Sequence, residues 1–290
     1  MNNNTSCIVS QQDNSILLKT FNSITDFHKR EFSEHHHSAI EISLVESGSG
    51  IYRVSDRAYN FQPGDVFLFS NNEIHYITEV FQTCSFITLQ FEPRFLWRNN
   101  TTDSDTEMLL GMFFNRSDEF TNLIDRQNPA TATVGKFIKQ LYTEMCEQSM
   151  QYQHMVKSLL ISLLVTIIRN YNYIDHSTEN VSIEGESLKT LDSAMNYINT
   201  HLDTALNLEE IAANCYLNKN YFSTLFKKLN GMSPWEYTTL KRVELAISLL
   251  KTTSLSTLEI SQRCGFNTSS NFYRAFKKLT GQNPNYYRKG

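Results

Sequence analysis

Residues 222–231 read FSTLFKKLNG and residues 272–281 read FYRAFKKLTG, so the chain repeats one pattern at an offset of 50 residues. The repeat extends upstream, where NLEEIAANCYLN at 207–218 aligns with STLEISQRCGFN at 256–267, at an offset of 49. The offset changes between the two aligned stretches, in a loop, where insertions are tolerated. A duplication of this kind indicates two copies of one supersecondary motif.

Each copy predicts a short helix, a tight turn and a second helix. Asn207 and Ser256 each precede a glutamate by three residues, which is the capping-box spacing at a helix start. Gly265 can adopt the left-handed conformation that ends the first helix of the second copy. Asn218 and Thr268 are N-cap candidates for the second helices. Two short helices joined by a tight turn, the second ending in Lys-Lys, indicate a helix-turn-helix.

The second helix of each copy divides into an apolar face and a polar face. Its apolar residues recur at i, i+3, i+4 and i+7, which predicts packing on the preceding helix. They are Phe222, Leu225, Phe226 and Leu229 in one copy and Phe272, Ala275, Phe276 and Leu279 in the other. The other face lacks acids and carries small polar groups and cations, which can bond base edges and phosphates in the major groove.

We therefore expect DNA contacts from eleven residues, namely Lys219, Asn220, Ser223, Thr224, Lys227, Ser269, Ser270, Asn271, Tyr273, Arg274 and Lys277. Between the copies, SPWE at 233–236 predicts an N-cap, a proline at the first helical position and a capping glutamate. The helix that follows is long enough to act as a strut that presents both recognition helices to groove segments about 34 Å apart. Two alternatives stay open: a protein-binding solenoid, and lysines that serve only solubility.

Charge is unevenly divided along the 290-residue chain, whose net charge is −4. Residues 188–290 hold 13 Lys and Arg against seven Asp and Glu, whereas the rest of the chain holds 13 against 23. Such asymmetry is typical of a polyanion-binding module attached to another domain, although two solvated surfaces could also differ by chance. The composition, 40% hydrophobic and 19% charged, predicts an ordinary globular protein of about two domains.

The five cysteines are odd in number and include no C-x-x-C pair, which argues against a disulfide framework and a zinc finger. The first residues lack the basic and apolar regions of a signal peptide. The most apolar stretch, 159–168, has about half of the 20 residues needed to span a bilayer. We expect a cytoplasmic protein with reduced thiols and no membrane partner.

The upstream half predicts a β-rich domain followed by helices, so the expected fold class is α+β. Segments rich in β-branched and aromatic residues, separated by turn signals at 48–50, 55–57 and 63–65, predict a small sandwich or barrel. These segments are 41–45, 51–54, 66–69 and 86–89. A helical pattern follows over 133–173, with an apolar stripe from Leu159 to Ile168 that we expect to serve partly as a homodimer surface.

Residues 188–290 closely resemble the DNA-binding domain of AraC/XylS-type transcription regulators, which consists of two helix-turn-helix units joined by one helix. The resemblance is carried by Arg242-x-x-x-Ala246-x-x-Leu249-Leu250, by residues 260–266 and 272–278, and by Gly281-x-x-Pro284 with Tyr286-Tyr287. Many members have an arginine where this chain has Thr224, so base reading by the first unit is expected to be weaker or differently directed. Arg274 keeps the family's arginine in the second unit.

HHHSAIE at 35–41, followed by Gly48, is similar to the first cupin motif, and His75 lies where the second motif places its histidine. In cupin enzymes such residues, here His35, His37, Glu41 and His75, hold a divalent metal, and this ligand set suits iron, manganese or zinc. The second motif is degenerate, and regulators that resemble this chain generally keep the barrel as a metal-free sensor. We therefore expect no metal and no cofactor. A metal-dependent cupin enzyme with a DNA-binding tail is the alternative.

The resemblance implies that residues 1–130 form a cupin-like sensor barrel, 131–174 a helical connector and dimerisation segment, 175–187 a linker and 188–290 the DNA-binding domain. A barrel of this size encloses one small ligand. Effector contacts, with a sugar as one candidate, are expected from His37, Glu41, Tyr52, His75 and Trp97, each of which could instead be structural. The expected function is a DNA-binding regulator, not an enzyme. Its partners would be double-stranded DNA, a small effector, a second copy and RNA polymerase. Whether it activates or represses stays open.

Overall fold

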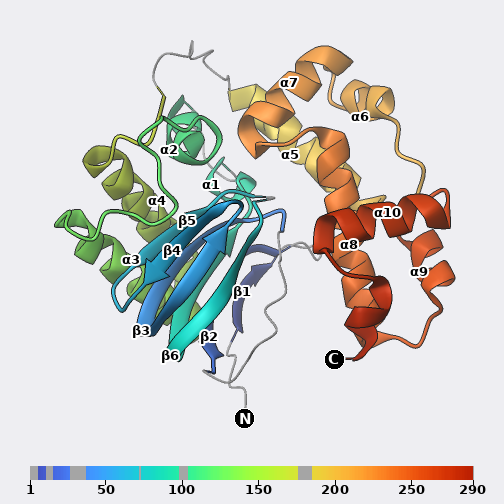
Figure 1. Ribbon diagram of the computed structural model, residues 1–290. Coiled ribbons are helices and arrows are strands. Elements are labelled where there is room, and N and C mark those ends of the chain that lie inside the picture. The colour runs from blue at the N-terminus through green and yellow to red at the C-terminus, as the bar shows by residue number, and fades with distance from the viewer. Residues whose placement is uncertain are drawn as a thin grey trace. The chain divides into compact units, whose positions relative to one another are not determined.

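The computed structural model describes residues 6–10, 16–26, 37–71, 73–97, 104–175 and 185–289. They form two compact units, whose main segments are Ala39–Gly185 and Glu186–Gly290. The first unit contains an antiparallel sheet with helices, and the second is helical (Figure 1). The predicted α+β class is confirmed. His35 and most of the predicted linker, 176–184, lie outside the described residues.

The sheet of the first unit has six strands, which pair in the order β1-β2-β6-β3-β4, with β5 added on β3. The strands are β1 (Ser6–Ser10), β2 (Ile16–Thr25), β3 (Ile40–Val54), β4 (Arg57–Phe61), β5 (Val66–Phe69) and β6 (His75–Phe91). All four predicted strand segments lie in these strands, whereas β1, β2 and β4 were not predicted. The pairing order ends at β1 and β4, and no pairing closes the described strands into a ring.

The prediction of a turn at residues 48–50 is wrong, because β3 runs through it as one bent strand. Gly48 has φ +82°, and a side chain there would place its Cβ 2.7 Å from Cys84 Cβ. The register of β3 against β6 shifts on both sides of this point. The bend lets the first half of β3 pair with β5 and the second half pair with β4.

The two faces of this sheet have different partners. One face is covered by α3 (Ala130–Glu147), whose Gly135 lies against Leu44, and α4 (Tyr152–Asn170) packs on α3 (Figure 1). In α4, Leu160, Leu163, Leu164 and Ile167 are fully buried, and Leu159 and Ile168 are half-buried. The curled inner face encloses a core of Val45, Tyr52, Val54, Phe61, Phe67, Phe69, Val80, Cys84 and Phe86.

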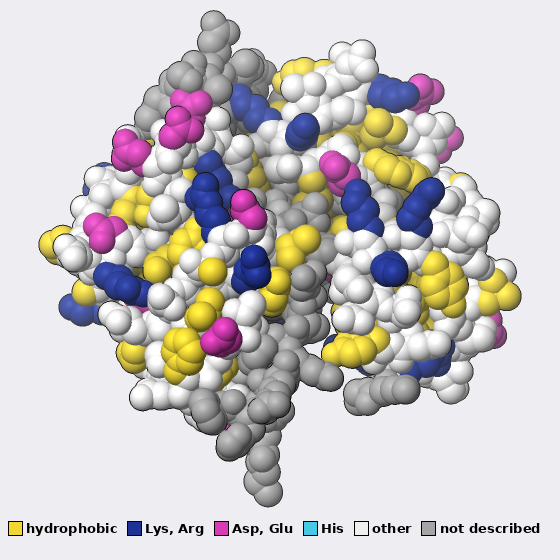
Figure 2. Space-filling view, in the orientation of Figure 1, with side chains coloured by type: hydrophobic (Ala, Val, Ile, Leu, Met, Phe, Trp, Pro, Cys, Tyr) yellow, Lys and Arg dark blue, Asp and Glu magenta, His cyan; other side chains and the backbone are white. Residues whose placement is uncertain are grey.

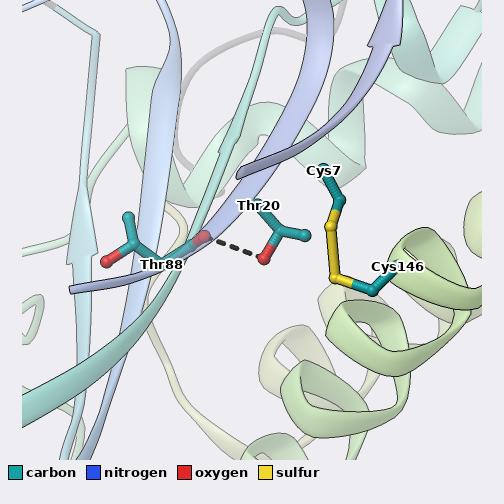
Figure 3. Close-up of a disulfide and its surroundings, with 4 residues drawn as sticks. All are labelled: Cys7, Thr20, Thr88 and Cys146. Carbon is teal, nitrogen blue, oxygen red and sulfur yellow. Dashed lines mark hydrogen bonds between the residues drawn. A yellow bond between two sulfur atoms is a disulfide. The ribbon is translucent and has the colours of Figure 1, made fainter. Parts of the chain in front are cut away.

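A disulfide joins Cys7 in β1 to Cys146 in the last turn of α3 (Figure 3). Their Cα atoms are 5.4 Å apart, although 139 residues separate them in the sequence. The expectation of reduced thiols is therefore wrong for this pair. The cysteine count could not reveal the pairing, because it depends on where the edge strand meets the helix in space. Cys84, Cys215 and Cys264 are free and buried.

The predicted duplication is present in the second unit, and corresponding helices of the two copies have equal lengths. Its helices are α5 (Gly185–Thr200), α6 (Leu208–Asn214), α7 (Lys219–Asn230), α8 (Pro234–Thr252), α9 (Thr257–Arg263) and α10 (Ser269–Thr280), followed by the 3₁₀ helix η1 (Pro284–Lys289). Helices α6 and α9 have seven residues each, and α7 and α10 have 12 each. Helix α5 starts inside the predicted linker. Two unpredicted helices, α1 (Arg94–Trp97) and α2 (Ser104–Phe114), belong to the first unit.

Most of the predicted helix caps are present. Ser233 and Ser256 form complete capping boxes with Glu236 and Glu259. The box predicted at Asn207 is not formed, since its side chain accepts from the Glu209 backbone instead. Asn218 and Thr268 cap α7 and α10. No described helix has the length and apolar character needed to cross a membrane.

Helix α8 supplies side chains to the cores of both helix-turn-helix copies. Near its start, the ring of Tyr237 lies 5.5 Å from that of Phe226 in α7. Further along, Val243, Ala246 and Leu250 pack in one cluster with Phe272 and Phe276 of α10. The strut predicted between the copies is thus a 19-residue helix, about 28 Å long at 1.5 Å per residue.

Candidate nucleic-acid interface and effector site

The phenylalanines on the apolar faces of α7 and α10 are fully buried, whereas Ala275 and Leu279 of α10 are half-buried. Phe222, Phe226, Phe272 and Phe276 have no exposed area, so the opposite face of each helix is turned to solvent. Of the eleven predicted DNA-contact residues, nine are exposed, and Ser223 and Ser269 are half-buried. Each helix is held by its aromatic residues against the helix before it, with its polar face open to solvent.

Arg274 on α10 is exposed and oriented by a neighbouring side chain. Its Nη2 donates to Asn271 Oδ1 at 2.9 Å, and the Asn271 backbone amide donates to the capping hydroxyl of Thr268 at 3.2 Å. The guanidinium is therefore tied to the N-terminal end of its helix, the end that contacts base edges in helix-turn-helix complexes. Lys and Arg side chains gather over α10 on the face shown in Figure 2.

Helices α7 and α10 carry three Lys or Arg residues each, but one cation of α7 is paired with an acid. Lys219 pairs with Glu209 of α6 at 3.1 Å, so an acid lies beside a predicted DNA contact. The hydroxyl of Thr224 donates to the Asn220 carbonyl at 3.0 Å and keeps its lone pairs for acceptance. The two copies therefore share a backbone plan and place one cation differently, at Lys219 in α7 and at Arg274 in α10, where α7 has Thr224.

Two exposed tyrosines near α7 were not predicted as site residues. Tyr221 is 44% exposed in the first turn of α7, and Tyr216 is 99% exposed in the turn before it. The sequence did contain a signal for them, because neither tyrosine belongs to the apolar stripe at i, i+3 and i+4 that packs on the preceding helix. Aromatic residues that lie off a core stripe are candidates for contacts with a partner.

A polar cluster lies inside the curled sheet. His75 Nε2 lies 3.6 Å from Glu41 Oε2, which also accepts from Gln90 Nε2 at 2.7 Å. The His75 ring stacks on Phe69 at 4.0 Å, and its Nδ1 lies 2.8 Å from the Glu73 carbonyl oxygen. Burial alone would lower the pKa of His75, but the Glu41 carboxylate and these hydrogen bonds raise it above its usual value.

His37, Glu41 and His75 each offer one ligand atom, and these atoms lie within 4.8 Å of one another. Two imidazoles and a carboxylate suit zinc, iron or manganese. The hydrogen bond from the His75 ring to a backbone carbonyl is the usual support of a metal-bound histidine. The arrangement fits a divalent cation, and it equally fits a metal-free ion pair between Glu41 and a protonated His75.

Of the remaining predicted effector contacts, Tyr52 belongs to this cluster. Its ring centre lies 6.3 Å from that of His75, and burial, with the Glu41 charge, raises the pKa of Tyr52 well above its usual value. Trp97 is buried in α1, and no described contact joins it to the other four residues. The structure thus brings His37, Glu41, Tyr52 and His75 together.

A separate cleft of about 340 Å³ opens beside the β3–β4 turn. It is lined by Val54, Ser55, Asp56, Arg57, Glu73, Arg116, Ser117, Asp118, Phe120 and Asn122. Arg116 binds Glu73 through two hydrogen bonds of 2.8 Å, and its guanidinium lies 3.9 Å from the centre of the Phe120 ring. Burial would raise the pKa of Glu73, but Arg116 lowers it overall. None of the five predicted effector residues lines this cleft.

The sequence matches known families along most of its length. Residues 23–164 match the AraC-like ligand binding domain, and residues 211–290 match a helix-turn-helix domain. The HTH-type transcriptional regulator YtdP of Bacillus subtilis (strain 168) is 35% identical over 118 residues, which are 40% of this chain and 15% of YtdP. The melibiose operon regulatory protein of Escherichia coli (strain K12) is 23% identical over 266 residues, covering 89% of this chain and 83% of that protein.

The fold is also found in a solved structure. ToxT from Vibrio cholerae aligns over 94% of this chain and 98% of its own, with a TM-score of 0.56 and 12% identity. At that identity the likeness concerns the fold alone, and it includes both units. Domain content and order agree with the sequence matches, and the chain belongs to the AraC family of DNA-binding transcription regulators, with a ligand-binding domain ahead of a helix-turn-helix domain.

Proposed function

We propose that this protein is a sequence-specific cytoplasmic regulator that reads DNA through the exposed faces of α7 and α10. The main support is the pair of equivalent helices whose aromatic faces are fully buried and whose cationic faces are open. The eleven residues predicted from the sequence are the proposed contacts, with Arg274 as the principal base reader. Double-stranded DNA is the primary partner and RNA polymerase a further one. We propose no cofactor and no catalytic activity.

The effector is proposed to bind inside the curled sheet. Support comes from the polar group formed by Glu41, Gln90 and His75 within an aromatic core, because polyhydroxylated ligands need hydrogen-bonding groups beside aromatic faces. The similarity to the melibiose operon regulatory protein supports a sugar as the ligand class. Ligand binding would bias how residues 188–290 engage DNA.

The active species is proposed to be a homodimer that pairs through α4 in the segment 131–174. Support comes from the outer side of this helix, where Leu159 and Ile168 stay half-buried and Met155 is 52% exposed. Two-fold pairing is the commonest form of oligomer. In this assignment residues 1–130 form the sensor, and 175–187 link it to the DNA-binding domain.

The test is a mobility-shift titration of the full chain on DNA from its own promoter, over a series of salt concentrations. Cations on α7 and α10 would displace counterions from DNA. The logarithm of the binding constant should therefore fall steeply and linearly with the logarithm of the salt concentration. Unrelated DNA of equal length serves as the control and should bind more weakly. Absence of salt-dependent binding to any DNA would favour the protein-binding solenoid.

A second candidate, a metal-dependent cupin enzyme, is favoured by the convergence of His37, Glu41 and His75. Metal analysis of the native protein separates the two candidates. A stoichiometric transition metal that is lost in His37→Ala would support the enzyme. A metal-free protein that is stabilised by a small metabolite would support the sensor.

A further inference from the structure

The disulfide between Cys7 and Cys146 joins a nearly buried residue to an exposed one. Cys7 is 9% exposed in β1, whereas Cys146 is exposed in the last turn of α3. Figure 3 shows the bond bridging the strand and the end of the helix. Since thiol–disulfide exchange requires a thiolate to approach one sulfur, we expect attack at the exposed residue, Cys146.

The other three cysteines are poorly suited to this chemistry. Burial raises the pKa of Cys84 to about 11 and that of Cys264 to about 12, and it also raises the pKa of Cys215. Buried thiols with raised pKa values form little thiolate and react slowly. All five cysteines lie in the described residues, so exchange is expected to concentrate on the Cys7–Cys146 pair.

The bond fastens a short edge strand that otherwise pairs with β2 and packs against α3. β1 has five residues, and its ladder is with β2, where Cys7 stands opposite Thr20 and the register shifts after Val9. Thr20 is fully buried, and its hydroxyl donates to the Thr88 carbonyl at 3.0 Å in β6 (Figure 3). A short edge strand belongs to the least stable part of a sheet, so we expect the disulfide to contribute to its attachment.

We propose that Cys146 is a modification site for small cellular thiols of the glutathione class, and that exchange there controls the docking of β1. The incoming thiolate attacks Cys146 Sγ, the Sγ–Sγ bond breaks, and its electron pair leaves on Cys7 Sγ, which takes up a proton. Cys146 then carries a mixed disulfide. A second thiolate attacks the small-thiol sulfur, which releases a small-molecule disulfide and frees Cys146. The reverse sequence, driven by the same small-molecule disulfide, restores the bond. Disulfides in reducing compartments are usually transient in this way.

The first experiment maps the chemistry in the native full-length protein. Samples are equilibrated with defined ratios of reduced to oxidised glutathione, trapped with an alkylating agent and analysed by peptide mass spectrometry. We expect the Cys7–Cys146 cross-link to give way to a glutathione adduct on Cys146 while Cys84, Cys215 and Cys264 stay unalkylated until the protein is denatured. An adduct on Cys7 instead, or a cross-link that survives until unfolding, would overturn the proposal.

The second experiment follows β1 itself by hydrogen–deuterium exchange of peptides covering residues 6–25. Reduction, or the surface variant Cys146→Ser, should accelerate exchange in these peptides by roughly tenfold or more. A disulfide that closes a long loop typically raises the folding equilibrium constant by more than tenfold. The matched control, Cys215→Ser, removes a buried thiol of the second unit and should leave these peptides unchanged. Equal exchange in oxidised and reduced protein would show that β1 does not depend on the bond. Neither readout involves DNA, so the inference stands or falls separately from the proposed regulatory function.

Discussion

The Arg242 guanidinium lies against Gly265, so closely that a Cβ on the glycine would stand 3.0 Å from Arg242 Cζ. The same guanidinium donates from Nε to the Leu202 carbonyl at 2.9 Å and from Nη2 to the Thr204 carbonyl at 2.6 Å. Gly265 has φ +72°, a conformation that other L-residues rarely adopt. One arginine therefore fixes the turn of the second copy and the segment that leads into the first.

Replacing this glycine should destabilise the second helix-turn-helix copy. Gly265→Ala introduces a left-handed alanine and a steric clash with the Leu202 carbonyl oxygen and the Arg242 guanidinium, and we expect a loss of about 2–4 kcal/mol in unfolding free energy. Urea denaturation of the full chain measures the change. A loss under 1 kcal/mol would mean that the turn relaxes freely around the new methyl group.

The first copy supplies the matched control. Tyr216 occupies the aligned position with φ 55° and is almost wholly exposed, so the residue is strained without being packed. Tyr216→Gly relieves the strain at the cost of backbone entropy, and the change in unfolding free energy should stay within about 1 kcal/mol. A large loss would show that the tyrosine ring contributes packing beyond the described contacts.

Truncating the proposed base reader should change selectivity as well as affinity. Arg274→Ala is expected to cost about 1–3 kcal/mol on the specific site and to relax discrimination at one base position. Competition binding with single-base variants of the site measures both effects. Lys277→Ala is the comparison, with a nearly equal loss on all sequences. If Arg274→Ala behaves in the same way, the arginine contacts only phosphate.

The ion pair between Lys219 and Glu209 suggests a change that strengthens DNA binding. Both side chains are half or more exposed, so the pair contributes little to stability. Glu209→Gln removes a negative charge beside the proposed interface and frees Lys219, and affinity should rise a few-fold at low salt. The gain should vanish at high salt, where exposed charges are screened. A loss of affinity would place Glu209 in a different role.

The buried pair of His75 and Glu41 predicts a pH-dependent stability in metal-free, chelator-treated protein. Because the folded-state pKa of His75 is raised, its contribution is complete below the unfolded value of about 6.5 and is lost as pH rises through the folded value. Melting temperature should therefore decline with rising pH in the wild type and less so in His75→Gln. Parallel curves for the two proteins would rule out this contribution.

The two candidate effector locations can be separated with charge-removing variants. Once a metabolite that raises the melting temperature is found, Glu41→Gln should abolish the rise, and Arg116→Ala in the cleft should keep it. Arg126→Ala controls for the loss of an arginine–carboxylate pair, since Arg126 pairs with Asp65 outside the cleft lining. The opposite result would assign the effector to the cleft.

The structure of the second unit was predictable because it is determined largely by residues close together in the sequence. Cap residues, helix stripes and turn glycines each act within a few positions, and the duplication gave each feature twice. The exception was Asn207, whose side chain caps one residue earlier than the spacing suggests. The DNA-contact face could be predicted as the side of each helix opposite its apolar residues. The ion pair of Lys219 could not, because its partner Glu209 lies on the neighbouring helix α6.

The first unit was harder to predict because its structure depends on distant segments. The glycine pair at 48–50 marks a turn in many sequences, but here it allows one strand to bend against β6. The cleft joins Glu73 to Arg116, and the disulfide joins residues 139 positions apart. No local pattern reports such contacts. The buried Glu41–His75 pair was reached through a motif resemblance and not through spacing.

Helix α8 packs on Phe226 through Tyr237 and on Phe276 through the cluster around Val243. Melting of either copy would strip packing from this shared helix and weaken the other. The region after residue 185 should therefore unfold cooperatively, as one thermal transition, although its sequence repeats. A destabilising substitution in one helix-turn-helix copy would then weaken DNA binding by both copies.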